Sequence, residues 1–79
     1  MPGLVLYSRP GCHLCEDMRA ALLPLLHAAG IGLDVVNIDD DAGLRARYGL
    51  RIPVLAFDGE VIAEGRLDVD ALRDALNIR

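Results

Sequence analysis

The sequence predicts an α/β fold with the element order β-α-β-α-β-β-α. Three kinds of pattern carry this prediction. Short continuous apolar runs are typical of covered strands, and longer segments with apolar residues at steps of three and four are typical of amphipathic helices. An Asp-Gly pair between two apolar runs indicates a β-hairpin. The first two strands are expected to be parallel, joined by a right-handed helical crossover, and the hairpin antiparallel. The result is a small mixed sheet flanked by helices.

The first strand is predicted over residues 4–7, and a helix is expected to follow from about Cys12 to Ala29. Gly30 supplies a C-terminal stop for this helix. Pro24 lies inside it, and because the apolar pattern continues beyond the proline, we expect a kink and not a break. The apolar stripe expected to face the sheet consists of Leu14, Met18, Leu22, Leu25 and Ala29.

The middle of the chain predicts a strand followed by a short helix. Residues 33–38 are rich in Val and Ile, as a strand requires. The acidic triplet 39–41 offers N-cap candidates for a helix over residues 42–48, which Gly49 ends. We interpret the triplet as capping and not as a metal site, because hard cations require ligands that converge from more than three consecutive residues.

The last third predicts a hairpin and a closing helix. Residues 53–57 and 60–64 are strand-like, and Asp58-Gly59 between them suits a type I′ turn. A final helix is expected to begin near Asp68, a plausible N-cap. Its predicted apolar face consists of Val69, Leu72 and Leu76.

Composition limits the classes of protein and partner. Seventy-nine residues predict one domain, residues 1–79. The net charge of −4 argues against nucleic acid or anionic membrane as a main partner, because both select basic surfaces. No apolar run approaches the roughly 18 residues that a membrane span needs. Residues 1–7 lack the basic region and cleavage site of a signal peptide, so we expect a cytoplasmic protein.

The two cysteines of the chain, Cys12 and Cys15, have three possible roles. A zinc site needs two more ligands, but no second C-x-x-C exists, and His27 is about 22 Å of helix from Cys12. We therefore expect no metal. Inert packing fits poorly, because the pair lies at a strand-to-helix junction and not within the apolar stripe.

A redox role has a physical basis at that junction. Residues three apart in a first helical turn bring their Cβ atoms to roughly 5–6 Å, close enough for disulfide closure after small adjustment. Cys12, at the N-cap or first helical position, should face unpaired N–H groups, which favour thiolate over thiol. Cys15 should be more buried and less ionised. A C-x-x-C beside a βαβ pattern is typical of a redox motif.

Charged neighbours should tune Cys12 further. Arg9 lies three residues upstream, and His13, when protonated, adds a second cation; both would lower the pKa of Cys12. Glu16 and Asp17 act in the opposite direction. We expect a lowered pKa as the net result.

Nearly the whole chain resembles the glutaredoxin branch of the thioredoxin-fold superfamily, and it is most similar to short glutaredoxin-like proteins of bacteria. The family's aromatic-x-basic-x-x-C-x-x-C segment is matched by "YSRPGCHLC" at residues 7–15, and the proline that opens its third strand by Pro53. A glycine-containing turn with an Asp before the last helix is partly matched by Gly65 and Asp68. The resemblance implies a thioredoxin-like (glutaredoxin-type) fold with a four-stranded mixed sheet.

The resemblance also implies a substrate site. It implies a cis Ile52–Pro53 bond, with the N–H and C=O of Ile52 free to pair with an extended substrate chain; from the residues alone, a trans proline opening a strand is the alternative. Tyr7, Gly65 and Asp68 would contribute to substrate binding. From its position alone, Tyr7 is equally a strand-end aromatic with its hydroxyl in water.

Together these features predict a thiol–disulfide oxidoreductase that reduces or exchanges disulfides through Cys12 and Cys15 and serves cell redox homeostasis. The expected substrate is a disulfide-containing protein or a glutathione mixed disulfide, recycled by glutathione or a thioredoxin-reductase system. Glutathione is a candidate co-substrate, and no tightly bound cofactor is expected. Two alternatives stay open: a glutathione-linked iron–sulfur cluster held by Cys12 of two chains, and a redox-inert module that docks an extended peptide near Pro53.

Overall fold

The computed structural model describes residues 3–77 and confirms the predicted order of elements. Met1 and Pro2, on which the predicted lack of a signal peptide partly rests, lie outside the described residues. No helix within the described range is long and apolar enough to cross a membrane. The elements are β1 (Leu4–Ser8), α1 (His13–Ala29), β2 (Asp34–Asn37), the 3-10 helix η1 (Ile38–Asp40), α2 (Ala42–Tyr48), β3 (Val54–Phe57), β4 (Glu60–Glu64) and α3 (Val69–Leu76).

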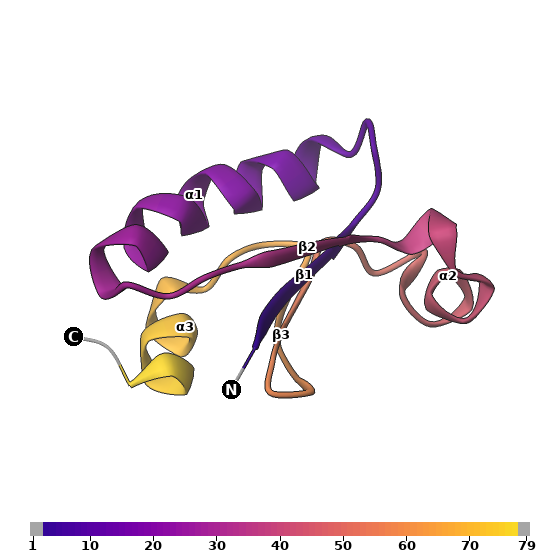
Figure 1. Cartoon of the computed structure of the whole chain (residues 1–79). Helices are drawn as coiled ribbons and strands as arrows, with labels where there is room; N and C mark the ends of the chain where they lie inside the picture. The colour runs from indigo at the N-terminus through magenta and orange to yellow at the C-terminus, as the bar shows by residue number, and fades with distance from the viewer. Residues whose placement is uncertain (1–2, 78–79) are drawn as a thin grey trace.

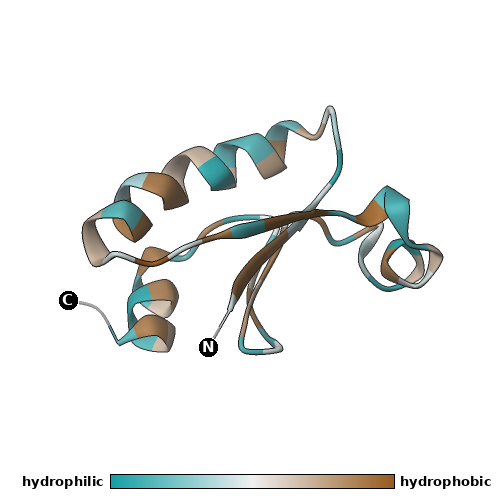
Figure 2. Cartoon of the chain, viewed as in Figure 1, coloured by the Kyte–Doolittle hydropathy of each residue, from teal (hydrophilic) through white to brown (hydrophobic). Residues whose placement is uncertain are grey.

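The four strands form one mixed sheet in the order β2-β1-β3-β4. β1 and β2 are parallel, and the β3–β4 hairpin is antiparallel, as predicted. β3 also pairs with β1, in the antiparallel sense. In Figure 1, α1 runs across the sheet, and α2 lies near the end of the sheet where β1 finishes and the chain turns into α1. Figure 2 shows β1 in the hydrophobic colour, whereas the chain becomes hydrophilic as it leaves the sheet toward α1.

The side chains of β1 alternate between the two faces of the sheet. Leu4 and Leu6 face α1 and α3 and belong to the main core. Tyr7 faces the other way and packs against a smaller cluster formed with α2. The main core otherwise contains Met18, Leu22, Leu26, Leu55 and Leu72, and the smaller cluster contains Ile38, Tyr48 and Val54.

Helix α1 ends as predicted but faces the sheet differently. Gly30 takes the left-handed conformation (φ 69°) that ends the helix, and the helix continues through Pro24. Leu14 was expected to begin the buried stripe, but it is 56% exposed. The prediction was wrong because two stripes satisfy helical spacing, and a cysteine thiol is apolar enough to begin the buried one. The buried stripe consists of Cys15, Met18, Leu22 and Leu26.

The hairpin and the start of α2 follow the predicted turn chemistry. Asp58 and Gly59 both have positive φ (53° and 84°), as a type I′ turn requires. Asp41 caps α2 by accepting a hydrogen bond from the Leu44 N–H at 3.0 Å. Capping therefore accounts for one member of the acidic triplet, and Asp39 has another partner, described below.

Helix α3 begins at the predicted cap. The Asp68 carboxylate accepts hydrogen bonds from the N–H groups of Asp70 and Ala71, at 3.0 and 3.1 Å. Leu72 is fully buried against the main core. Val69 was wrongly predicted to share that buried face, since it is 39% exposed in the first turn of the helix.

Candidate active site

The cysteine pair lies where β1 ends and α1 begins. Cys12 and Cys15 are joined as a disulfide, with their Cα atoms 5.2 Å apart. The short loop between Ser8 and His13 carries the chain from the sheet into the helix, so the pair stands at one end of the sheet. The structure therefore contains the disulfide that the spacing of the two cysteines predicted.

Cys12 is the N-cap of α1. It has extended backbone angles (φ −88°, ψ 106°), and its Sγ accepts a hydrogen bond from the Cys15 N–H at 3.2 Å. The prediction that this sulfur faces free N–H groups of the first turn is confirmed. In the reduced protein the same N–H and the positive end of the helix favour a thiolate at this position.

Cys15 lies one turn further along and is only 3% exposed, whereas Cys12 is half-buried. The predicted difference in burial is confirmed. The sequence argument that the pair stands outside the apolar stripe was wrong for this residue, since Cys15 heads the stripe above Met18. Burial among apolar groups disfavours the thiolate of Cys15, so the two sulfurs have opposite preferences.

The two residues expected to tune Cys12 occupy different positions. His13 is the first residue of α1 and is exposed. The Arg9 guanidinium forms an ion pair with Asp39 at 2.9 Å, between side chains that are 37% and 43% exposed. This pair ties the cysteine loop to η1 and offsets part of the positive charge that Arg9 was expected to offer Cys12. Sequence reasoning assigned Asp39 to capping and missed this partner.

Tyr7 stacks on Tyr48, with ring centroids 4.5 Å apart and planes at 24°. The guanidinium groups of Arg51 and Arg47 lie 5.3 and 5.8 Å from the centroid of the Tyr48 ring, within cation–π range. Sequence reasoning missed Tyr48, although its spacing of four residues from Leu44 on α2 is a core signal. The Tyr7 ring is therefore packed against a second aromatic ring and does not stand free at the strand end.

The backbone on either side of the Ile52–Pro53 bond forms hydrogen bonds with other parts of the chain. The Ile52–Pro53 peptide bond is cis. Ile52 was expected to have a free N–H, but this group donates to the Tyr48 carbonyl at 3.0 Å, so that prediction was wrong. The reason is that Tyr48 is the last residue of α2, and its carbonyl needs donors from beyond the helix. The Pro53 carbonyl in turn accepts from the Gly65 N–H at 2.8 Å.

Gly65 and Asp68 lie on the segment between β4 and α3. Gly65 has a positive φ of 71°, which glycine adopts without steric cost. Asp68 serves as the N-cap described above. A pocket of about 320 Å³ lies between this segment and α1, lined by Leu14, Asp17, Met18, Ala21, Gly65, Arg66 and Leu67.

A second pocket beside the pair, of about 270 Å³, lies between the start of α1 and β2. Its described lining includes Cys15 but not Cys12. The lining residues are Leu6, Ser8, Arg9, Pro10, Cys15, Glu16, Arg19, Val35 and Asn37. Within residues 3–77 no group of three or more His, Cys, Asp or Glu side chains could hold a metal ion.

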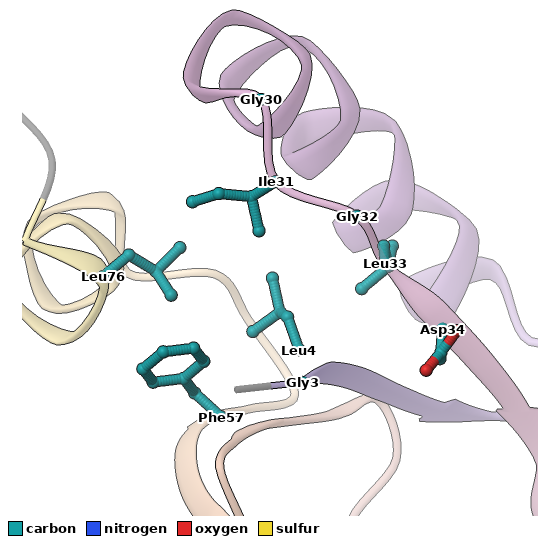
Figure 3. A pocket seen from close by; sticks show the side chains of 9 residues that line it. All are labelled: Gly3, Leu4, Gly30, Ile31, Gly32, Leu33, Asp34, Phe57 and Leu76. Carbon is teal, nitrogen blue, oxygen red and sulfur yellow. The ribbon is translucent and has the colours of Figure 1, made fainter. Parts of the chain in front are cut away.

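A larger pocket, of about 640 Å³, lies at the opposite end of β1. Figure 3 shows that mostly apolar side chains surround it, including Leu4, Ile31, Leu33, Phe57 and Leu76. Its described lining contains no cysteine, so this pocket lies apart from the Cys12–Cys15 pair.

Known proteins with similar sequences or structures identify the family of this chain. The family model "Glutaredoxin-like domain (DUF836)" matches residues 3–77. An uncharacterized protein of Mycobacterium tuberculosis is 33% identical in an alignment that covers 91% of this chain and 79% of the relative. The solution structure of a protein from Nitrosomonas europaea is similar with a TM-score of 0.84 and 37% identity, covering 94% of this chain and 89% of that one.

A more distant similarity shows the fold alone. The holo form of a glutaredoxin from Populus tremula x tremuloides has a TM-score of 0.52 and 20% identity, covering 94% of this chain and 73% of that one. The mixed sheet, its covering helices and the cysteine pair after β1 thus define a protein of the thioredoxin fold. Within that class, the chain belongs to the glutaredoxin-like (DUF836) family.

Proposed function

We propose that this protein is a dithiol–disulfide oxidoreductase that reduces or exchanges disulfides through Cys12 and Cys15. The observation that carries the proposal is the contrast between the two sulfurs. Cys12 is half-buried at the start of α1 and accepts the Cys15 N–H at 3.2 Å, while Cys15 is buried one turn away and within bonding reach. An accessible nucleophile beside a shielded second thiol is the arrangement that disulfide exchange requires.

The reaction proceeds in two exchanges. The Cys12 thiolate attacks one sulfur of the substrate disulfide, a Cys12–substrate disulfide forms, and the other half of the substrate leaves as a thiolate. Cys15 then loses its proton and attacks the Cys12 sulfur. The Cys12–Cys15 bond forms, and the second half of the substrate leaves and is protonated. Two electrons pass from the protein dithiol to the substrate disulfide.

The remaining assignments belong to the same proposal. The substrate is a disulfide-containing protein or a glutathione mixed disulfide, glutathione is the candidate co-substrate, and no cofactor is held tightly. Glutathione or a thioredoxin-reductase system returns the disulfide to the dithiol. The cytoplasmic location is part of the proposal, and fractionation of the producing cell tests it.

Trapping tests the proposed function. The Cys15→Ser variant should keep the first exchange and lose the second, so it should accumulate mixed disulfides on Cys12 that mass spectrometry identifies. The Cys12→Ser variant is the matched control and should trap nothing. The absence of any Cys12 adduct in the Cys15→Ser protein would refute the mechanism. Visible absorbance after anaerobic purification would support the iron–sulfur alternative instead.

A further inference from the structure

The second exchange requires a proton acceptor for Cys15. This inference rests on the proposed function, in which Cys15 must become a thiolate before it attacks Cys12. Cys15 is 3% exposed, and burial disfavours its charged form. Within residues 3–77 no charged or polar side chain is buried, so the core supplies no internal base. A proton acceptor for Cys15 therefore has to reach it from a solvent-filled space.

The pocket of about 270 Å³ between α1 and β2 is such a space, because Cys15 is part of its lining. Among the described residues that line it, Glu16 is the one carboxylic acid. The charged groups Arg9 and Arg19 also line it, but a guanidinium does not accept a proton at neutral pH. Arg9 is paired with Asp39, and within the described chain no ion pair of Glu16 is found.

We propose that Glu16 is the general base of the second exchange, acting on Cys15 through water in this pocket. The proton of the Cys15 thiol passes to the Glu16 carboxylate, and the resulting thiolate attacks the Cys12 sulfur. The Cys12–Cys15 bond forms as the bond between Cys12 and the substrate sulfur breaks. The departing substrate thiolate takes a proton from Glu16 or from solvent, so that Glu16 returns to its carboxylate form.

Asp17 provides a matched control on the same helix. It is also acidic and lies one residue further along, so removal of its charge changes the field at the start of α1 in a similar way. However, Asp17 lines the other pocket, with Leu14 and Gly65, and not the pocket that reaches Cys15. Comparison of Glu16→Gln with Asp17→Asn therefore separates proton transfer from a general charge effect.

The test uses the reduced protein and dithiodipyridine, a symmetric disulfide that releases one absorbing thione in each exchange. The first thione appears in a phase whose rate rises with reagent concentration, and the second appears in a phase independent of it. Glu16→Gln should slow the second phase by at least about 10-fold and leave the first within about twofold. Asp17→Asn should leave the second phase near that of the wild type.

Two further measurements distinguish a base from a structural role. Glu16→Asp should recover part of the second-phase rate, and added acetate should accelerate the second phase of Glu16→Gln but not that of the wild type. Equal second-phase rates in Glu16→Gln and Asp17→Asn would overturn this inference and leave the proposed function intact. Failure of the wild type to release the first thione would overturn the proposed function, and this inference with it.

Discussion

The two ends of the central strand β1 differ in both shape and chemistry. Where β1 begins, a pocket of about 640 Å³ is lined mainly by apolar side chains such as Leu33 and Phe57 (Figure 3). Where β1 finishes, a smaller pocket that Cys15 helps to line lies beside the disulfide between Cys12 and Cys15. In this protein the candidate active site is therefore identified by the position of the two cysteine sulfurs and not by the volume of a pocket.

The helix that joins the two ends explains the difference. At the end where β1 finishes, α1 begins, and its free N–H groups favour a negative charge. At the other end α1 stops at Gly30, whose N–H donates to the carbonyls of Leu26 and His27. The carbonyl end of a helix disfavours an anion, so a thiolate placed there would lose the support that Cys12 has.

The largest effect should come from removing the nucleophile. Cys12→Ser should lower disulfide reductase activity to the background rate, because the hydroxyl does not replace the thiolate in exchange. At the opposite end of β1, Leu33→Ala should enlarge the apolar pocket and leave the activity of the folded protein within about twofold. Steady-state turnover of a neutral disulfide measures both variants. If Leu33→Ala lost as much reductase activity as Cys12→Ser, the proposed functional difference between the two ends of β1 would be wrong.

The next largest effect should be on stability, and it concerns the buried face of α1, the helix that connects the two ends. Leu22 is fully buried in the middle of α1, and Leu22→Ala should lower the free energy of unfolding by about 2–5 kcal/mol. Leu23, its neighbour on the exposed face, is 45% exposed, and Leu23→Ala should change stability much less. Urea unfolding followed by circular dichroism provides the measurement. Equal losses in the two variants would contradict the orientation described for α1.

A smaller effect should follow loss of the α3 cap. Asp68→Ala removes the acceptor for two N–H groups and should cost about 0.5–2 kcal/mol of stability. Asp74→Ala, on the same helix, serves as the control and should stay within about 0.5 kcal/mol of the wild type. The glutathione KM of the Asp68 variant tests the substrate role predicted for this residue. An unchanged stability would show that the cap contributes little.

The smallest effect should come from the ion pair that ties the cysteine loop to η1. Both side chains are more than a third exposed, so a double-mutant cycle of Arg9→Gln and Asp39→Asn should give a coupling of about 0.2–1 kcal/mol. Thermal unfolding at low and high salt measures it, since salt screens an exposed pair. A coupling above that range that persists in high salt would assign the pair a larger structural role.

Most of the fold could be predicted from local patterns because its turns carry strong signals. The boundaries of helices and strands depend on the backbone chemistry of a few neighbouring residues. Examples are the Asp58-Gly59 turn, the helix end at Gly30 and the caps at Asp41 and Asp68. The buried face of α1 was harder to predict. Two stripes satisfy the helical period, and only contact with the sheet selects the one that includes Cys15.

The site was predictable where it depends on one segment and not where segments meet. The contrast between Cys12 and Cys15 follows from positions in one helical turn and could be predicted. The engagement of the Ile52 N–H by Tyr48, and of Arg9 by Asp39, depends on how separate segments close on one another. Sequence spacing carries no signal for such tertiary partners.

The central claim is that the start of α1 holds Cys12 as a reactive thiolate. The most direct measurement is the rate of alkylation by iodoacetamide against pH in the reduced Cys15→Ser variant, whose one thiol is Cys12. The midpoint should lie clearly below the free-cysteine value of about 8.5, and Cys12 should react faster at neutral pH than Cys15 does in the Cys12→Ser variant. A midpoint at or above that value would show that the start of α1 does not activate Cys12.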